Sequence, residues 1–409
     1  MKYILKTKKL GELTSYMAKG IPPKYADNFS ENTIFVLNQK CNRDFKISYE
    51  YARFHNTSIK KVPEEKMLKS GDVLINSTGT GTAGRIAQIF NVIKPTTIDG
   101  HMILMRPTAE IDSLYYGYAL KAHQSAIESL AEGSTGQTEI NKKRLSDEIF
   151  ITYPDDISVQ KEIVYILYAY DNIIENNQKQ IKLLEEASQR LYKEWFVDLR
   201  FPNYENTPVI DGVPKEWKRI PIKDLSALLR RGISPKYNDM AEYNVINQKC
   251  IRQTVMNIRE SRKQEKSYLD EMNLQDSDIV ICSTGAGTLG RVGQVFGEYP
   301  DTTFDSHVTL VRAKEEVGKQ FLFQSLKYQQ PLFMTLGKGS TNQLELSKRT
   351  IENYDIIYPT DKIIQAFEFI AQPIHEKITA LVSVVKSATE ARNRLLPKLI
   401  NGEILIKEH

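Results

Sequence analysis

The stretch that decides the fold is Asp72-Val-Leu-Ile-Asn-Ser-Thr-Gly79, because it returns as Asp278-Ile-Val-Ile-Cys-Ser-Thr-Gly285. The two copies are 206 residues apart, and the same spacing relates Gly84-Arg85 to Gly290-Arg291. Small drifts in the spacing of other blocks are what loops of different length produce. Those blocks are Gly20–Tyr25 with Gly232–Tyr237 and Asn38–Cys41 with Asn247–Cys250, whereas Asp99-x-His101 with Asp305-x-His307 and Gly133–Thr135 with Gly339–Thr341 keep the spacing of 206 residues. The chain is therefore a duplicated half, and a fused pair of this kind is expected to keep a dimer's two-fold symmetry.

The composition is that of an ordinary globular protein with two or three domains. Of the 409 residues, 41% are hydrophobic and 26% are charged, which is usual for folded domains. No run of about 18 apolar residues is present and the start lacks a secretory signal, so we expect a cytoplasmic protein without a membrane span. Cys41, Cys250 and Cys282 form no metal-spaced pair and are expected to be reduced, buried thiols.

Each half begins with a mixed α/β stretch, in which alternating apolar runs predict strands and longer periodic segments predict helices at 113–131 and 318–336. The expected strands are 72–75, 85–90, 102–105 and 149–154 in the first half, and 278–281, 291–296, 308–311 and 356–359 in the second. The predicted fold class is α+β. Its predicted segments are a globular domain at 1–157, a long helix at 158–200, a second globular domain at 201–360 (with a linker at 201–216), and a second helix with a tail at 361–409.

Both long helices carry an apolar seam with alternating steps of four and three residues, which is the heptad pattern of a coiled coil. The seam residues are Ile163, Leu167, Tyr170, Ile174, Ile181, Leu184, Leu191 and Trp195 in the first helix, and Phe367, Ile374, Ile378, Leu381, Val385, Leu395 and Leu399 in the second. Two seams of equal length should bury against each other, and the two-fold symmetry makes that pairing antiparallel. The alternative is that each helix packs only on its own globular domain.

A glycine-rich loop follows one strand in each half and resembles a nucleotide-binding motif. Gly79-Thr-Gly81-Thr-Ala-Gly84 and Gly285-Ala-Gly287-Thr-Leu-Gly290 both read G-x-G-x-x-G. A dinucleotide site needs the third glycine to open a helix, whereas Arg85–Phe90 alternates as a strand. The sequence therefore favours a strand-to-strand loop. Such a loop can lay backbone N–H groups and hydroxyls on DNA phosphates, and a purely structural turn is the alternative.

Two-fold related domains suit a two-fold related ligand, and double-stranded DNA is the commonest one. Polar side chains in the repeated blocks are candidate DNA contacts, each with a solvated surface group as the alternative. They are Lys24, Gln39, Lys40, Ser77, Thr78, Thr80, Arg85, Gln137, Lys236, Gln248, Lys249, Ser283, Thr284, Thr288, Arg291 and Gln343. His101 and His307 are interpreted as structural histidines. The divergent stretches 42–66 and 251–275 are expected to help set base preference. The net charge of +4 permits DNA binding without establishing it.

The sequence contains no catalytic constellation. An amino-methyltransferase needs an Asn/Asp-Pro-Pro-aromatic tetrad, and the one Pro-Pro pair lies in Ile21-Pro22-Pro23-Lys24. Zinc-protease, nucleophile-elbow and P-loop motifs are also missing. We therefore predict no catalytic, cofactor-binding or metal-binding residue. The alternatives are a stand-alone DNA methyltransferase and a DNA-binding regulator.

The order of these elements resembles the specificity subunits of type I restriction–modification enzymes. The likeness lies in the segments Gly133–Pro154, Gln160-Lys-Glu-Ile163 and Leu191-Tyr-Lys-Glu-Trp-Phe196, and in their second copies at Gly339–Thr341, Tyr358-Pro359, Gln365 and Leu395–Ile404. The resemblance covers effectively the whole chain. The second copy has Gln365-Ala-Phe367 in place of the first copy's Gln-Lys-Glu-Ile.

This resemblance implies a non-catalytic subunit with two target-recognition domains. Each domain would read one half of a bipartite, asymmetric DNA target, and the paired helices would hold the two domains at a set spacing. The implied partners are two methylation subunits, which use S-adenosylmethionine, and restriction subunits, which use ATP and Mg²⁺. No cofactor is expected in this chain itself.

Overall fold

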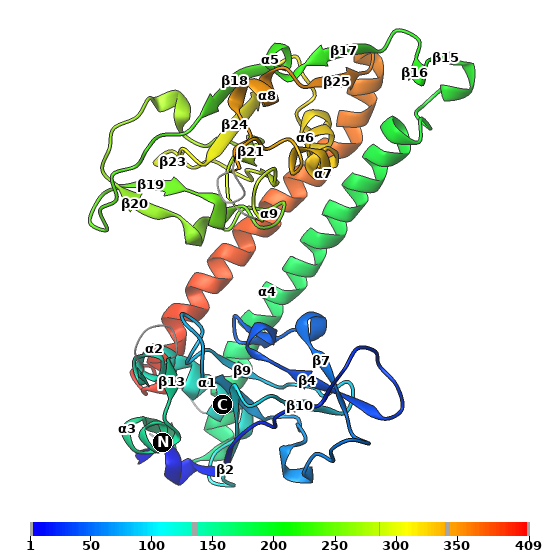
Figure 1. Ribbon diagram of the computed structural model, residues 1–409. Coiled ribbons are helices and arrows are strands. Elements are labelled where there is room, and N and C mark those ends of the chain that lie inside the picture. The colour runs from blue at the N-terminus through cyan, green and yellow to red at the C-terminus, as the bar shows by residue number, and fades with distance from the viewer. Residues whose placement is uncertain (1–2, 133–137, 286, 340–343, 407–409) are drawn as a thin grey trace. The chain divides into compact units, whose positions relative to one another are not determined.

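The computed structural model describes residues 3–132, 138–285, 287–339 and 344–406, and the chain forms two compact units (Figure 1). Unit 1 combines Met1–Ile173 with Ser387–His409, and unit 2 is Ile174–Lys386. The border between the units therefore falls inside both long helices, whereas the predicted segments had treated each helix as a piece of its own. Each unit holds one globular domain and a stretch of each helix.

The globular domain of unit 1 is built on two four-stranded sheets. The first has the strand order β2-β11-β8-β9 and is antiparallel throughout. The second has the order β10-β4-β7-β3, in which β10 and β4 are parallel. The strands are β2 (Thr14–Lys19), β3 (Tyr25–Ala26), β4 (Thr33–Leu37), β7 (Arg53–Asn56), β8 (Val73–Asn76), β9 (Ile86–Gln88), β10 (Thr96–Ile98) and β11 (Met102–Pro107).

Smaller elements complete unit 1. The N-terminal strand β1 (Leu5–Lys9) pairs antiparallel with β14 (Phe150–Pro154), which leads into the long helix α4. The others are the pair β5 (Asn42–Arg43) and β6 (Lys46–Ile47), the helices α1 (Ser113–Ala122), α2 (Gln124–Ser129) and α3 (Lys142–Glu148), and the pair β12 (Ala131–Glu132) and β13 (Glu139–Ile140). The single helix predicted at 113–131 is thus two helices that meet at His123.

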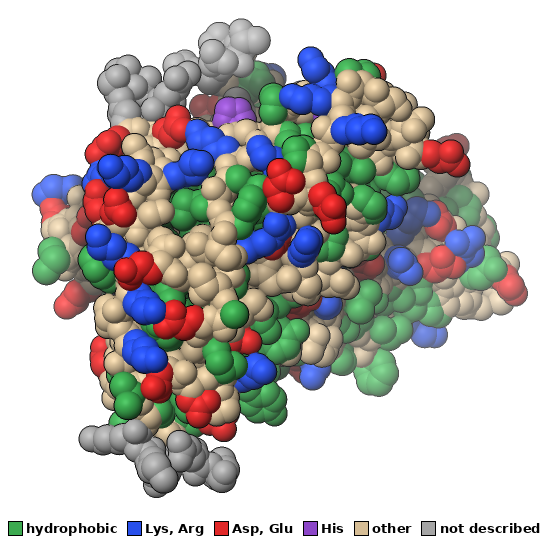
Figure 2. Space-filling view, turned by 90° about the horizontal axis from the view of Figure 1, so that it is seen from below, with side chains coloured by type: hydrophobic (Ala, Val, Ile, Leu, Met, Phe, Trp, Pro, Cys, Tyr) green, Lys and Arg blue, Asp and Glu red, His purple; other side chains and the backbone are tan. Residues whose placement is uncertain are grey.

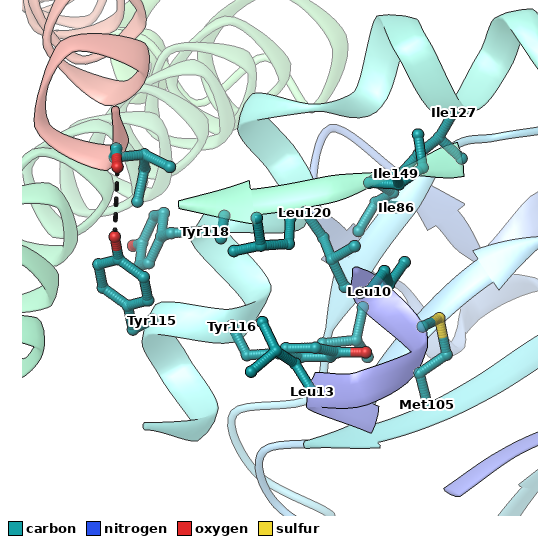
Figure 3. Packing of buried hydrophobic residues seen from close by; sticks show 14 of the residues in the cluster. Leu10, Leu13, Ile86, Met105, Tyr115, Tyr116, Tyr118, Leu120, Ile127 and Ile149 are labelled. Carbon is teal, nitrogen blue, oxygen red and sulfur yellow. Dashed lines mark hydrogen bonds between the residues drawn. The ribbon is translucent and has the colours of Figure 1, made fainter. Parts of the chain in front are cut away.

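The core of unit 1 lies between the first sheet, α1 and the long helices. Three tyrosines of α1, Tyr115, Tyr116 and Tyr118, are completely buried. In Figure 3, Tyr116 lies beside Leu13, and its hydroxyl is 2.7 Å from the Thr14 hydroxyl. The Tyr115 hydroxyl instead reaches the carbonyl oxygen of Ile400 (3.4 Å), so the C-terminal helix closes the core of the N-terminal domain.

Unit 2 repeats this architecture. Its antiparallel sheet has the order β18-β24-β21-β22 and its second sheet the order β20-β19-β23, with β19 and β23 parallel. The elements are β15 (Val209–Ile210), β16 (Val213–Pro214), β17 (Lys218–Pro221), α5 (Ile222–Leu225), β18 (Ser226–Arg231), β19 (Tyr243–Ile246), β20 (Arg262–Gln264), β21 (Ile279–Cys282), β22 (Val292–Gln294), β23 (Thr302–Phe304), β24 (Val308–Ala313), α6 (Lys319–Tyr328), α7 (Gln330–Phe333), α8 (Lys348–Glu352) and β25 (Asp355–Tyr358).

Strand register confirms the predicted duplication. Leu74 of β8 faces Leu104 of β11 in unit 1, and the residues 206 positions further on, Val280 and Leu310, face each other in unit 2. The predicted linker at 201–216 contributes to the unit 2 core, because Phe201 is buried and packs on Trp217 with ring centroids 4.9 Å apart.

Two long helices run through the units: α4 (Ile157–Tyr192), which continues as a π-helical turn over Lys193–Val197, and α9 (Asp361–Ile400). In unit 2, Trp195 packs on Phe367 with ring centroids 5.8 Å apart, and Ile181 clusters with Ile378 and Leu381. In unit 1, Asp171 pairs with Arg392. Partner numbers fall along α9 as they rise along α4, so within unit 2 the helices pair antiparallel, as predicted.

The predicted seam describes burial well, but its residues serve two kinds of packing. Every predicted seam residue is buried or half-buried. Ile163 and Leu167 join the core of the unit 1 domain, and Trp195 and Phe367 join that of unit 2. Ile181 belongs to a smaller cluster made mostly of residues from the two helices. Helix-to-helix packing and helix-to-domain packing, posed as alternatives, therefore both occur.

The three cysteines are fully buried and unpaired. Burial raises the pKa of the Cys41 and Cys250 thiols to about 11 and that of Cys282 to about 12, so they remain protonated and unreactive at neutral pH. Among the described residues, no helix is long and apolar enough to cross a membrane.

A matched pair of substitutions on α9 tests this packing. Phe367→Ala removes a ring with no exposure, and we expect it to lower the free energy of unfolding of unit 2 by about 3–5 kcal/mol. Phe369→Ala, two residues away, removes a ring that is 83% exposed and should leave stability nearly unchanged. Urea-induced unfolding followed by tryptophan fluorescence measures both, since Trp195 and Trp217 lie in this core. Equal midpoints for the two variants would contradict the assigned packing.

Candidate nucleic-acid interface

The glycine-rich segment of unit 1 is a closed connection between two antiparallel strands. Asn76 N donates to Arg85 O (3.0 Å) and Gly84 N donates to Asn76 O (2.9 Å), so the segment returns at once to the sheet as β9. Gly79, Gly81 and Gly84 all have positive φ, at 110°, 69° and 87°, which glycine adopts without steric cost. No helix begins here, so the geometry is that of the predicted strand-to-strand loop.

A hydrogen-bonded group of polar side chains lies at the base of this loop. Gln39 Nε2 donates to the Thr78 carbonyl oxygen (2.6 Å) and to the Thr78 hydroxyl (2.5 Å). The Thr78 hydroxyl also lies 2.9 Å from His101 Nδ1. On the other side of the loop, an Arg85 guanidinium nitrogen donates to Gly81 O (2.9 Å). Residues from three separate repeated blocks of sequence therefore meet at one place.

Unit 2 repeats the Gln–Thr–His and Arg–Gly contacts of this group. Gln248 Nε2 donates to the Thr284 hydroxyl (2.7 Å), which lies 2.7 Å from His307 Nδ1. Arg291 donates to Gly287 O (2.6 Å). We call each group the loop surface. It comprises Gln39, Thr78, Gly81, Arg85 and His101 in unit 1, and Gln248, Thr284, Gly287, Arg291 and His307 in unit 2.

A buried aspartate carboxylate accepts a hydrogen bond from the backbone N–H of each exposed histidine. Asp99 Oδ1 accepts from His101 N, and Asp305 Oδ1 accepts from His307 N, both at 2.9 Å. Burial raises the pKa of both carboxyl groups, and the backbone hydrogen bonds oppose that shift. A Cβ on Gly20 would lie 2.1 Å from Asp99 O, which explains why the first repeated block begins with glycine.

The basic candidates differ between the two units. Lys24, Lys40, Lys236 and Lys249 are all exposed, and Lys236 also forms an ion pair with Glu265. That pair raises the pKa of Lys236. In the same region, the Arg53 guanidinium lies 3.3 Å from the Tyr25 ring centroid, and Arg262 lies 3.6 Å from that of Tyr237. These repeated cation–π pairs hold two further basic groups next to the lysine blocks.

Some sequence-predicted contacts need correction. Ser77 and Ser283 have no exposure, so their hydroxyls do not reach the surface and the prediction that they contact DNA is wrong. The predicted structural role of His101 and His307 is incomplete, because both rings are exposed. Gln137 and Gln343 lie outside the described residues. Thr80 is exposed on the loop.

One loop residue was missed. The Thr82 hydroxyl lies within hydrogen-bond range of Thr78 O and Gly79 O (3.4 and 3.3 Å), as the Thr288 hydroxyl does with Thr284 O and Gly285 O (3.0 and 3.2 Å). Aligning the two copies at 206 residues would have paired Thr82 with Thr288. Both hydroxyls hold the turn of the loop in shape.

Surface charge alone does not mark the site. Figure 2 shows one face of the molecule, on which Lys and Arg side chains are interspersed with Asp and Glu. Next to the loop, Lys19 pairs with Glu139 in unit 1, and Arg231 pairs with Glu345 in unit 2 (2.9 Å). In the part of the chain that the structure describes, no group of three or more His, Cys, Asp or Glu residues could hold a metal ion.

Comparison with known proteins identifies the class. The family model of the type I restriction modification DNA specificity domain matches the chain twice, over residues 5–186 and 214–386. The two matches cover most of the chain and coincide with the two repeats, so the chain belongs to this family. It is a specificity subunit of a type I restriction–modification system, a non-catalytic subunit that recognises DNA.

Individual relatives agree with this assignment. The MjaIX specificity subunit of Methanocaldococcus jannaschii is 26% identical over 383 residues, which covers 88% of this chain and 85% of that protein. The HindI specificity subunit of Haemophilus influenzae is 23% identical over 469 residues, covering 95% and 98%. The crystal structure of the type I S subunit from M. genitalium has the same fold, with a TM-score of 0.58, 16% identity, and coverage of 97% and 96%.

Two glycines of the loop make a matched test of its geometry. Gly81→Ala places a methyl group where no atom lies within 4 Å and costs only the strain of positive φ, about 1–2 kcal/mol. In Gly84→Ala the new Cβ lies 2.6 Å from Glu128 Cα, so α2 must move at a further cost of about 1–3 kcal/mol. Thermal unfolding should show the larger loss for Gly84→Ala. The opposite ranking would contradict this loop structure.

Proposed function

We propose that each unit contacts one half of a bipartite, asymmetric DNA target through its loop surface and the variable segments beside it. The observation that carries this proposal is the repetition of one polar constellation, with the same hydrogen bonds, in both matched specificity domains. Amide, hydroxyl, imidazole and guanidinium groups are the donors that contact phosphates and base edges. Glycines with positive φ let a DNA backbone approach the loop closely.

The segments that differ between the units are suited to read different bases. In unit 1, residues 42–47 form the small antiparallel pair β5–β6. In unit 2, the matching stretch runs through Thr254, whose carbonyl oxygen accepts from Gln294 N (2.9 Å), into a short 3-10 turn at Ile258–Glu260. We therefore assign base preference to the stretches 42–66 and 251–275, as the sequence suggested.

The chemistry of modification belongs, in this proposal, to other subunits. The sequence carries no methyltransferase tetrad and no P-loop lysine motif, which disfavours a stand-alone DNA methyltransferase. S-adenosylmethionine would bind to methylation subunits, and ATP and Mg²⁺ to restriction subunits. A stand-alone DNA-binding regulator remains the alternative, and it differs in needing no partner for specific binding.

Reconstitution tests this division of labour. Purified chain mixed with a target duplex and radiolabelled S-adenosylmethionine should transfer no methyl group, and addition of the methylation subunits of the same system should start transfer at fixed positions. The methylation subunits alone should modify no specific site. Transfer by the isolated chain would support the methyltransferase alternative. Specific, tight DNA binding that methylation subunits leave unchanged would support the regulator.

We propose that the methylation subunits dock at two exposed aromatic side chains. Tyr165 on α4 is 77% exposed and Phe369 on α9 is 83% exposed. Each lies two residues after the first seam residue of its helix, and two residues turn an α-helix by about 200°, so both rings project away from the seam. Exposed large aromatics at equivalent positions are typical anchors of a protein interface. Two equivalent anchors fit two copies of one partner.

Single substitutions should remove one partner copy at a time. Tyr165→Ala or Phe369→Ala should convert a complex with two methylation subunits into one with a single tightly bound copy, and the double variant should lose both. An anchor of this kind contributes about 2 kcal/mol or more to binding. Native mass spectrometry measures the stoichiometry, and Leu183→Ala, at another exposed position on α4, is the control. Unchanged stoichiometry in the double variant would refute this docking site.

A further inference from the structure

His101 and His307 end a chain of hydrogen bonds that fixes where each imidazole ring carries its proton. In unit 1 the chain starts at Gln39, whose side-chain nitrogen lies 2.6 Å from the Thr78 carbonyl oxygen. A carbonyl oxygen only accepts, so this contact identifies the amide nitrogen of Gln39 and with it the orientation of the amide group. The same nitrogen also donates to the Thr78 hydroxyl (2.5 Å).

The Thr78 hydroxyl accepts from Gln39, which leaves its own proton free to be donated to a second partner. The acceptor that the structure pairs with this hydroxyl is His101 Nδ1, at 2.9 Å. A neutral imidazole that accepts at Nδ1 carries its proton on Nε2. In unit 2, Gln248, Thr284 and His307 are joined in the same order at 2.7 Å and 2.7 Å. Each ring is thus held as an Nε2–H donor.

These donors are held firmly and are available to a ligand. The backbone N–H of each histidine is bound by a buried aspartate carboxylate, which fixes the residue at the start of β11 or β24. Both rings are exposed. Among the described residues, neither Nε2 has a hydrogen-bond partner, although Nδ1 of each ring does. A rigidly positioned donor with nothing to donate to is a feature of a binding surface.

We propose that His101 and His307 each donate Nε2–H to a phosphate oxygen of the DNA backbone, one in each half-site, with Gln39–Thr78 and Gln248–Thr284 as positioning pairs. This inference rests on the proposed function. Base edges differ between two unrelated half-sites, whereas the phosphate backbone is common to both. The constellation is the same in both units although the segments beside it differ, so it suits the part of the ligand that is the same.

Local charge is compatible with a phosphate at this place. Glu139 forms a backbone β-bridge with Thr78, and Glu345 forms one with Thr284. The Glu139 carboxylate pairs with Lys19, and the Glu345 carboxylate pairs with Arg231. Their negative charge is balanced within the protein. Lys40 and Lys249 directly follow the positioning glutamines and are exposed. A positive charge therefore lies next to the first residue of each Gln–Thr–His chain.

The test uses the complete complex with its methylation subunits and a duplex that contains its target. Asparagine can place an amide nitrogen near the position of Nδ1 but not of Nε2, whereas glutamine can reach toward Nε2. We expect His101→Asn to weaken DNA binding about tenfold and His101→Gln to weaken it less than about threefold. His307→Asn should act alike, and the two losses should multiply in the double variant.

A second pair of variants tests the positioning role. Thr78→Val removes the hydroxyl at nearly constant shape and should weaken binding, whereas Thr78→Ser keeps the hydroxyl and should retain wild-type affinity. The methylated sequence should stay the same in all variants, because a phosphate contact carries no base information. Phosphate-ethylation interference reads the contact directly: one interfering phosphate per half-site should disappear from the wild-type pattern in the corresponding His→Asn variant.

The outcomes separate this inference from the function on which it rests. A wild-type complex that does not bind its target would overturn both. A wild-type complex that binds, with His101→Asn and His307→Asn variants that bind equally well, would overturn the inference alone. A changed methylation sequence in either variant would also overturn it, since the histidine would then read a base. Thermal unfolding of each variant ensures that a loss of affinity is not a loss of folding.

Discussion

The constraint on which the structure depends is that neither globular domain buries its apolar surface with its own stretch of chain. The core of unit 1 is made mainly by residues before Ile173, but Leu396, Leu399 and Ile400 from the far end of the sequence close it. The core of unit 2 likewise needs Tyr192 and Trp195 from the end of α4, which precede the whole second domain in the sequence. Packing of α4 and α9 segments against each other and the domain is therefore part of folding each globular domain. A change in helix register would damage both a helix contact and a domain core.

The two units meet this constraint with different polar chemistry. In unit 1, Asp171 lies against Arg392 and accepts from the Tyr118 hydroxyl (2.6 Å), and Lys121 lies 3.7 Å away. Burial lowers the pKa of Lys121 to about 8 in spite of the neighbouring carboxylate. At the matching positions of unit 2, Gln324 donates to Ser188 (2.9 Å) and His375 replaces the aspartate. A buried charge that loses its partner is much more costly than a lost neutral hydrogen bond. A wrong helix pairing in unit 1 would therefore leave the partly buried Asp171 and Arg392 without their charged partners.

The repeat made the fold predictable, and the limits of the prediction have physical causes. Duplication, the main sheet and both helices followed from motifs and from heptad spacing. The second sheet did not, because strands such as β3 and β10 are two or three residues long and too short to show a period. Ser77 was misplaced because all residues of β8 and the residue after it are buried. A strand covered on both faces has no alternation that distinguishes inside from outside. The hydrogen bonding of His101 could not be predicted either, because it joins His101 to Thr78 and through Thr78 to Gln39, which are distant in sequence.

In the proposed function, different segments of each domain supply affinity and specificity. With a net charge of +4, and with Lys19, Arg231 and Lys236 paired to glutamates, fewer cations near the loop surfaces, such as the exposed Lys40 and Lys249, are available to phosphates. Proteins that bind DNA mainly by releasing counterions need many such groups. Neutral hydrogen-bond donors at fixed positions provide less long-range attraction than cations do, but they fix the position of each domain along the DNA backbone. The position of each domain along the DNA must be fixed before the variable segments 42–66 and 251–275 can contact particular base edges. In the proposed function, the repeated part of the sequence holds the DNA in place, and the divergent part determines which DNA sequence is bound.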